Sequence, residues 1–118
     1  MSLKLLALDT STEACSAALY IDAGITQHYK AAPREHTHLI LGMIEQLLQD
    51  AGLKSSEIDV LAFGRGPGSF MGVRVAAGVV QGISFAHSIP VVPVSTLAAI
   101  ASVAMQRTGQ SQVLAAID

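Results

Sequence analysis

The stretch Ile58–Ala86, IDVLAFGRGPGSFMGVRVAAGVVQGISFA, decides the fold of this 118-residue chain. It begins with an apolar run, Ile58–Phe63, which hardly alternates and therefore predicts a strand buried on both faces. A glycine-rich loop, Gly64–Ser69, follows, and an apolar helix is predicted from about Phe70 to Ala86. A strand, a tight loop and a helix in this order are typical of a parallel α/β unit.

Three short strands are predicted before this unit, because short apolar runs there alternate with turn-like residues. They span Leu5–Leu8, Cys15–Ile21 and Ile25–Lys30. Tight turns between them indicate an antiparallel meander. Apolar residues at helical spacing then predict a helix that ends at Gly52.

After the unit come a strand at Val91–Val94, a helix from Ser95 to about Arg107 and an apolar strand at Val113–Ile117. The order βββ–α–β–α–β–α predicts a mixed sheet with helices on its faces. The final strand has no hairpin partner. We therefore expect the chain to be the first half of a longer protein.

The composition is that of a compact domain: 51% of the residues are apolar and 14% are charged, against about 25% charged in ordinary domains. This excludes intrinsic disorder, and a net charge of −2 offers no basic surface for autonomous nucleic-acid binding. A single cysteine, Cys15, and the absence of a signal-peptide pattern predict a cytoplasmic protein.

No Asp, Glu, Lys or Arg occurs between Val75 and Gln106. Polar residues and prolines interrupt this segment, so a membrane span is disfavoured. Burial is the favoured interpretation, against the sheet of the same domain or against a partner.

Two segments could bind a ligand. Asp9, Thr10 and Ser11 follow the first strand and could hold a phosphate and a Mg²⁺ ion, or they form a polar hairpin turn. Gly66 and Gly68 precede a helix and could bind an anion, or they permit a sharp turn. Neither segment matches a Walker or dinucleotide-binding motif.

No catalytic or metal-binding residues are predicted. His36 and His38 would lie about 200° apart around a helix, so they cannot chelate one ion together. No serine or cysteine is placed with a base as a nucleophile would require.

Three segments, Leu6–Tyr20, Pro33–Leu48 and Ile58–Ala86, together with Val94–Ala101, closely resemble the N-terminal half of the TsaB (YeaZ) family. These are bacterial subunits of the machinery that makes threonylcarbamoyladenosine next to the tRNA anticodon. The resemblance covers essentially the whole chain and implies an actin/hexokinase/Hsp70-like (ribonuclease H-like) fold of two similar domains. On this basis residues 1–111 are expected to form the first domain and 112–118 the first strand of a second domain that this chain lacks. Met71 departs from the family pattern, which usually has Thr there.

The resemblance implies a scaffold or activating subunit and not an enzyme. TsaD, the catalytic paralogue, carries a pair of metal-binding histidines where this chain has Thr96 and Ile100. We therefore expect no cofactor in this chain, with nucleotide and metal held by a TsaD-like partner. A TsaE-like ATPase would join the assembly, and the chain alone would form a homodimer.

The resemblance also places the partner contact on the helices Thr37–Gln49 and Met71–Ala86. Gly78 and Gly82 share one face of the second helix and would allow close approach. The expected interface residues are Leu41, Glu45, Val75, Gly78, Val79 and Gly82. The alternative function is a nucleotide-binding ATPase or kinase-like enzyme that uses Asp9 and the Gly64–Ser69 loop.

Overall fold

The computed structural model describes residues 3–10, 14–22, 24–31, 36–67 and 70–95. The strands are β1 (Lys4–Asp9), β2 (Ala14–Ile21), β3 (Gly24–Ala31), β4 (Val60–Gly66) and β5 (Val91–Ser95). The helices are α1 (His36–Ala51), a short 3₁₀ helix η1 (Ser55–Glu57) and α2 (Phe70–His87). Each element expected up to residue 95 has a counterpart in the structure. The helix expected from Ser95 to about Arg107 and the strand expected at Val113–Ile117 lie outside the described residues, as does the proposed domain boundary.

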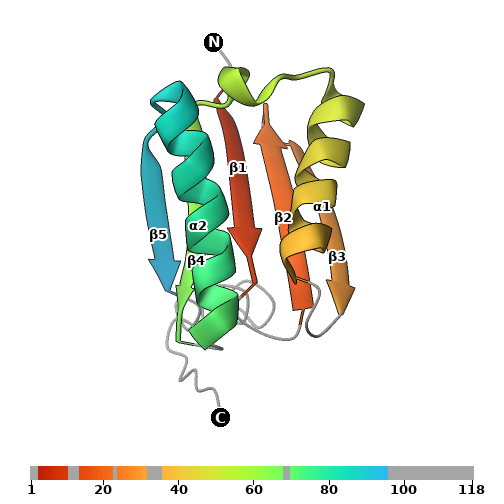
Figure 1. Cartoon of the computed structure of the whole chain (residues 1–118). Coiled ribbons are helices and arrows are strands. Elements are labelled where there is room, and N and C mark those ends of the chain that lie inside the picture. The colour runs from red at the N-terminus through yellow and green to blue at the C-terminus, as the bar shows by residue number, and fades with distance from the viewer. Residues whose placement is uncertain (1–2, 11–13, 23, 32–35, 68–69, 96–118) are drawn as a thin grey trace, which may run out of the picture.

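The five strands form one mixed sheet in the order β3-β2-β1-β4-β5 (Figure 1). β1 pairs antiparallel with β2, and β2 with β3, as the predicted meander requires. On its other side β1 pairs parallel with β4, which in turn pairs parallel with β5. Because parallel neighbours cannot be joined by a hairpin, α1 and α2 make the crossovers to β4 and β5.

The core lies between the sheet and its two helices. Every second residue of each strand points toward the helices, because successive side chains of a strand alternate between the two faces of the sheet. The buried side chains that form this layer are Leu6, Leu8, Cys15, Ala17, Leu19, Ile40, Ile44, Leu47, Leu61, Ala76 and Val80. The layer holds α1 over β2 and β3 and α2 over β1 and β4 (Figure 1).

Helices were expected on the faces of the sheet, and the two long helices of the described residues, α1 and α2, lie on the same face (Figure 1). The opposite face carries exposed apolar side chains, namely Leu3, Ile25, Tyr29, Val92 and Val94. The reason for the single covered face is the chain order: each of the two crossovers runs over the same side of the sheet.

The two long helices end in the same hydrogen-bond motif. After α1, the Gly52 N–H donates to the Gln49 carbonyl at 3.1 Å and the Leu53 N–H to the Leu48 carbonyl at 2.8 Å. Gly52 has a φ of 69°, the left-handed conformation that this motif requires, so the predicted stop is confirmed. After α2, the Ile89 N–H donates to the Ser84 carbonyl at 3.3 Å, but the left-handed position is Ser88, with a φ of 54°.

Substitutions at these two positions should have opposite effects. Gly52→Ala should lower the free energy of unfolding by about 1 kcal/mol, because a Cβ disfavours left-handed backbone although nothing lies near it. Ser88→Gly should raise it by about 0.5 kcal/mol, the strain relieved exceeding the extra entropy of an unfolded glycine. Urea denaturation of both variants measures these changes, and a loss of stability in Ser88→Gly would contradict the argument.

Candidate functional site

Asp9 and Thr10 follow one another at the end of β1 and therefore face opposite sides of the sheet. Thr10 is fully buried on the helix side, where its Oγ1 accepts a hydrogen bond from the Ala76 N–H of α2 at 3.1 Å. Asp9 lies on the opposite side, at a pocket. The sequence analysis placed the two residues together, in a ligand site or in a polar hairpin turn, whereas in the structure their side chains lie on opposite faces of the sheet.

The pocket beside Asp9 has a volume of about 270 Å³. Its described lining is mostly alanine and other apolar side chains, with Asp9, Ser16, Gln27 and Ser95 as the polar members. Asp9 is the single charged side chain among these lining residues, so the pocket is anionic and would need a cation before it could hold a phosphate. No group of three His, Cys, Asp or Glu side chains suited to a metal ion occurs in the described parts of the chain.

The Gly66 backbone has a φ of 96°, which glycine adopts without a steric penalty, and Gly66 is buried. It supports the sharp turn that was one of the two interpretations of this loop. Ser11 and Gly68, the remaining predicted ligand residues, lie outside the described residues.

Gly64 has a packing role that the sequence pattern did not reveal. A Cβ on Gly64 would lie 2.6 Å from Oδ2 and 2.7 Å from Cγ of Asp9. The missing side chain therefore makes room for the Asp9 carboxyl group over β4. The sequence analysis interpreted this loop as an anion site or a sharp turn, and neither interpretation identified Asp9 as the neighbour of Gly64.

The buried hydroxyl of Thr10 should contribute measurably to stability. Thr10→Val keeps the shape of the side chain and removes the acceptor of the Ala76 N–H, so the free energy of unfolding should fall by about 1 kcal/mol. Urea denaturation followed by circular dichroism measures the change. An unchanged urea midpoint would show that the hydrogen bond between Thr10 and Ala76 does not contribute to stability.

Cys15 lies in the core on β2, and burial, with a second contribution from the negative charge of Asp9, raises the pKa of its thiol above the ordinary 9.0. The unfolded thiol therefore ionises at a lower pH than the folded one. Stability should accordingly fall as the pH rises above about 9. Cys15→Ala should reduce the slope of unfolding free energy against pH between pH 8 and 10, measured by urea denaturation, and an equal slope in both proteins would contradict this.

The outer surface of the helix layer holds most of the expected interface residues. Gly78 and Gly82 on α2 are exposed, as is Glu45 on α1, and Leu41 is 50% exposed. Val75 and Val79 differ, because they are half-buried and pack against the core of their own domain. The two helices lie side by side (Figure 1), so the exposed members belong to one side of the molecule.

Three exposed glycines in helix interiors have no packing role among the described residues. A Cβ added to Gly42, Gly78 or Gly82 would meet nothing within 4 Å. A glycine inside a helix is less stable than alanine by about 1 kcal/mol. Packing against the described residues therefore does not explain these glycines.

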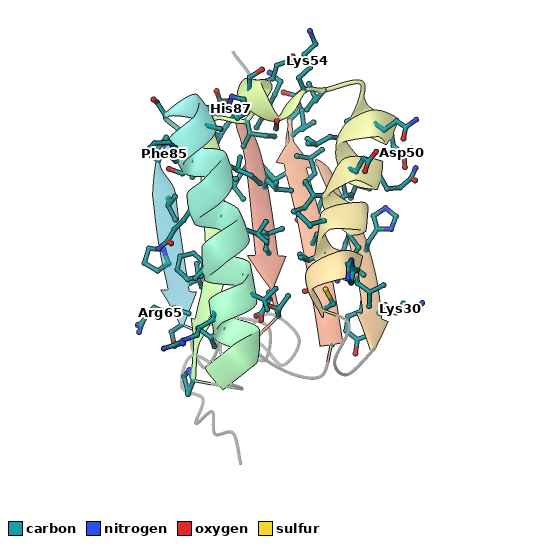
Figure 2. The ribbon with its side chains drawn as sticks, in the orientation of Figure 1. Lys30, Asp50, Lys54, Arg65, Phe85 and His87 are labelled. Carbon is teal, nitrogen blue, oxygen red and sulfur yellow. The ribbon has the colours of Figure 1, made fainter. Side chains whose placement is uncertain are left out.

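Phe85 is a strongly exposed apolar residue that the sequence analysis did not name. It is 92% exposed and lies on the last turns of α2, on the side away from α1 (Figure 2). The signal was present in the spacing, because residues seven apart lie on the same side of a helix and Phe85 follows Gly78 by seven. The sequence analysis did not name Gly42 either, although it lies beside Leu41.

The comparisons with known proteins identify the family of the chain. A family model described as TsaD, tRNA N6-adenosine threonylcarbamoyltransferase, matches residues 26–118. The chain belongs to this family. Two relatives named tRNA threonylcarbamoyladenosine biosynthesis protein TsaB match almost the whole chain and confirm its resemblance to TsaB proteins. The protein of Escherichia coli is 46% identical over 98% of this chain, and that of Haemophilus influenzae is 51% identical over 99%.

The solved structure described as YeaZ from Pseudomonas aeruginosa is 52% identical with a TM-score of 0.93, and the match covers 98% of this chain and 55% of that one. This likeness and the mixed α/β sheet fit the predicted actin/hexokinase/Hsp70-like fold. The chain spans about half the length, 50%, of the two TsaB relatives. None of the helices in the described residues is long and apolar enough to cross a membrane.

Proposed function

We propose that this chain is part of a non-catalytic subunit in tRNA threonylcarbamoyladenosine biosynthesis and that it binds a TsaD-like catalytic subunit through the outer surface of α1 and α2. The single observation that carries the proposal is the composition of the exposed side of α2. Its outer side combines two glycines that nothing in the described domain requires with an almost fully exposed phenylalanine. The names of the TsaB relatives support the pathway.

The charge pattern supports a protein partner. Arg74 is the one Asp, Glu, Lys or Arg residue of α2, and the rest of the helix is uncharged. Interface centres are typically depleted in charge and contain aromatic anchors, whereas solvated helix faces are charged. Leu41 on α1 extends the apolar part of this surface to the neighbouring helix.

In this proposal the reaction takes place on the TsaD-like partner, which holds the nucleotide and the metal. The resemblance assigns its metal-binding histidines to positions that are Thr96 and Ile100 here, outside the described residues. A TsaE-like ATPase joins the assembly, and the chain alone forms a homodimer through the same surface.

Size-exclusion chromatography with light scattering tests the proposal on this chain alone and mixed with a TsaD-like protein from the same organism. A mixed peak at the summed mass supports it. Two unchanged peaks at concentrations of tens of micromolar would overturn the assignment of the partner surface to this chain.

The alternative function, a nucleotide-binding enzyme, can be tested directly at the pocket beside Asp9. If the chain were an ATPase or kinase-like domain, Mg²⁺–nucleotide should bind there and Asp9→Asn should weaken the binding. Isothermal titration with ATP and Mg²⁺, before and after this substitution, distinguishes the two functions. Nucleotide binding that depends on Asp9 would favour the enzyme.

A further inference from the structure

The sheet formed by the described residues has two edge strands, and they differ in how well they resist pairing with another strand. β5 is one edge. It has five residues, its Pro93 has no backbone N–H to donate, and its register with β4 shifts between Gly64 and Gly66. β3 is the other edge, with eight residues, no proline and an unbroken register with β2. Short strands, prolines and irregular pairing protect sheet edges, so β3 is the edge that can accept a further strand.

β3 presents different side chains on the two faces of the sheet. Ile25 and Tyr29 lie on the face without helices and are 69% and 65% exposed. Lys30 lies on the helix side, because its partner on β2, Cys15, belongs to the core. Lys30 is also the one charged residue of β3 among Asp, Glu, Lys and Arg. A strand that pairs with β3 should therefore offer apolar side chains on one face and an acidic group near Lys30 on the other.

The acidic group that would complement Lys30 is present in the same chain, at the other end of the same edge (Figure 2). Asp50 is exposed in the last turn of α1, where its Oδ1 accepts a hydrogen bond from Nε2 of Gln46 at 2.8 Å. Asp50, Gly24 and Thr26 line one cavity of about 270 Å³ between α1 and β3. A two-fold rotation about the middle of β3 would bring the Lys30 end of one copy to the Asp50 end of the other.

We propose that β3 pairs antiparallel with β3 of a second copy of this chain, so that the two sheets join into one across a two-fold axis at Gln27. This contact differs from the one proposed for α1 and α2 and does not rest on it. Its backbone hydrogen bonds use the N–H and C=O groups of β3 that point away from β2. A two-fold contact must be self-complementary, and the side chains of β3 meet that condition.

The apolar side chains select the register. Because successive side chains alternate between faces, two-fold pairing sets residues of the same face opposite one another. With the axis at Gln27, Ile25 of each copy stands opposite Tyr29 of the other. Pairs of an aromatic and a β-branched residue stabilise adjacent strands. With the axis at His28, two imidazoles would meet and Ile25 would stand opposite Ala31, which buries less apolar surface.

Charge favours the same register. Lys30 of each copy stands opposite Gly24 of the other, and Gly24 has no side chain to block the way to Asp50. Because α1 lies over β2 and β3 (Figure 1), two to three strand spacings, about 10–14 Å, would separate the two α1 helices. Helices in contact are about 8–10 Å apart, so the helices do not clash and Lys30 has room to reach Asp50. Each dimer would hold two such ion pairs.

The contact leaves the outer side of α2 uncovered, because α2 lies over β1 and β4 (Figure 1). A partner at Gly78 and Phe85 and a second copy at β3 can therefore be bound at the same time. One strand from each copy makes a small contact, so we expect the pairing to be weak and reversible.

Cysteine cross-linking tests the register. Gln27→Cys should form a disulfide-linked dimer with itself under mild oxidation, because directly opposite residues have Cβ atoms about 4.5–5.5 Å apart. Ile25→Cys should link to Tyr29→Cys in an equal mixture but not to itself, since its two copies would lie about 14 Å apart along the strands. Val92→Cys, at an exposed position on the other edge strand, is the matched control and should not link. Cys15 is buried and stays in place.

Charge reversal tests the ion pairs. Sedimentation equilibrium is carried out on the whole chain with Gly78→Glu, which removes the contact proposed for the helices, so that pairing through β3 is measured alone. Lys30→Glu should raise the dimer dissociation constant by about tenfold, because two attractions become two repulsions. Asp50→Lys should act in the same way. The two substitutions together should restore the dimer, a recovery that damage to the fold would not produce.

Three results would overturn the pairing: a Gln27→Cys chain that links no faster than Val92→Cys, a double charge reversal that dimerises no better than the single ones, or a Gly78→Glu chain that stays monomeric up to millimolar concentration. Binding of the TsaD-like protein is measured separately by light scattering and should be unchanged by Lys30→Glu. Failure of the β3 contact and failure of the proposed function are therefore distinguishable.

Discussion

Gly64→Ala is expected to lower the free energy of unfolding by about 2 kcal/mol, within the range of overpacking substitutions. The added methyl group would lie 2.6 Å from Oδ2, 2.7 Å from Cγ and 3.0 Å from Oδ1 of Asp9, so it contacts the whole carboxyl group. Asp9 has a short side chain at the end of β1 and cannot move aside by bending its far end alone. Urea denaturation of the variant measures the loss.

A double-mutant cycle attributes this loss to the contact. Asp9→Ala removes the carboxyl group, so adding Gly64→Ala in that background should have little further effect. The expected coupling between the two substitutions is about 2 kcal/mol, typical of residues in direct contact. Additive losses would show that Gly64 is needed for another reason, such as its own backbone conformation.

The sequence predicted the elements well where apolar spacing and backbone chemistry point the same way. The run Ile58–Phe63 became β4, and the apolar segment after the glycine loop became α2. Gly52 ends α1 because the left-handed position of that motif favours glycine. At the end of α2 the same position is Ser88, so the identity of the residue alone did not mark the stop.

The sequence predicted the candidate site less well because a site depends on contacts between distant segments. Asp9 and Thr10 are neighbours in the chain, but their side chains point to opposite faces of the sheet. Thr10 therefore contacts Ala76 and Asp9 lies beside Gly64. Neither contact leaves a local pattern, since the partners are more than fifty residues away. Spacing along one helix is local, so the sequence could place Gly78 and Gly82 on one face of α2, and the structure leaves both of them exposed.

Gly78→Glu is expected to abolish binding of the TsaD-like partner, lowering its affinity by at least about 100-fold. The position is exposed with nothing within 4 Å, so the free chain accommodates the new side chain without strain. In the complex the carboxylate would be buried in an uncharged contact without a counter-charge. Light scattering or titration calorimetry with the partner measures the effect.

Lys30→Glu is the control for this prediction, because it changes the charge by a larger amount at the far edge of the sheet, on β3 (Figure 2). Both variants should unfold at a midpoint close to that of the unchanged chain, which separates a lost contact from a lost fold. If Lys30→Glu weakens binding as much as Gly78→Glu, the effect is one of net charge and the helix surface is not the interface. If Gly78→Glu alone loses the partner, glycine is required there by a neighbour that this domain does not contain.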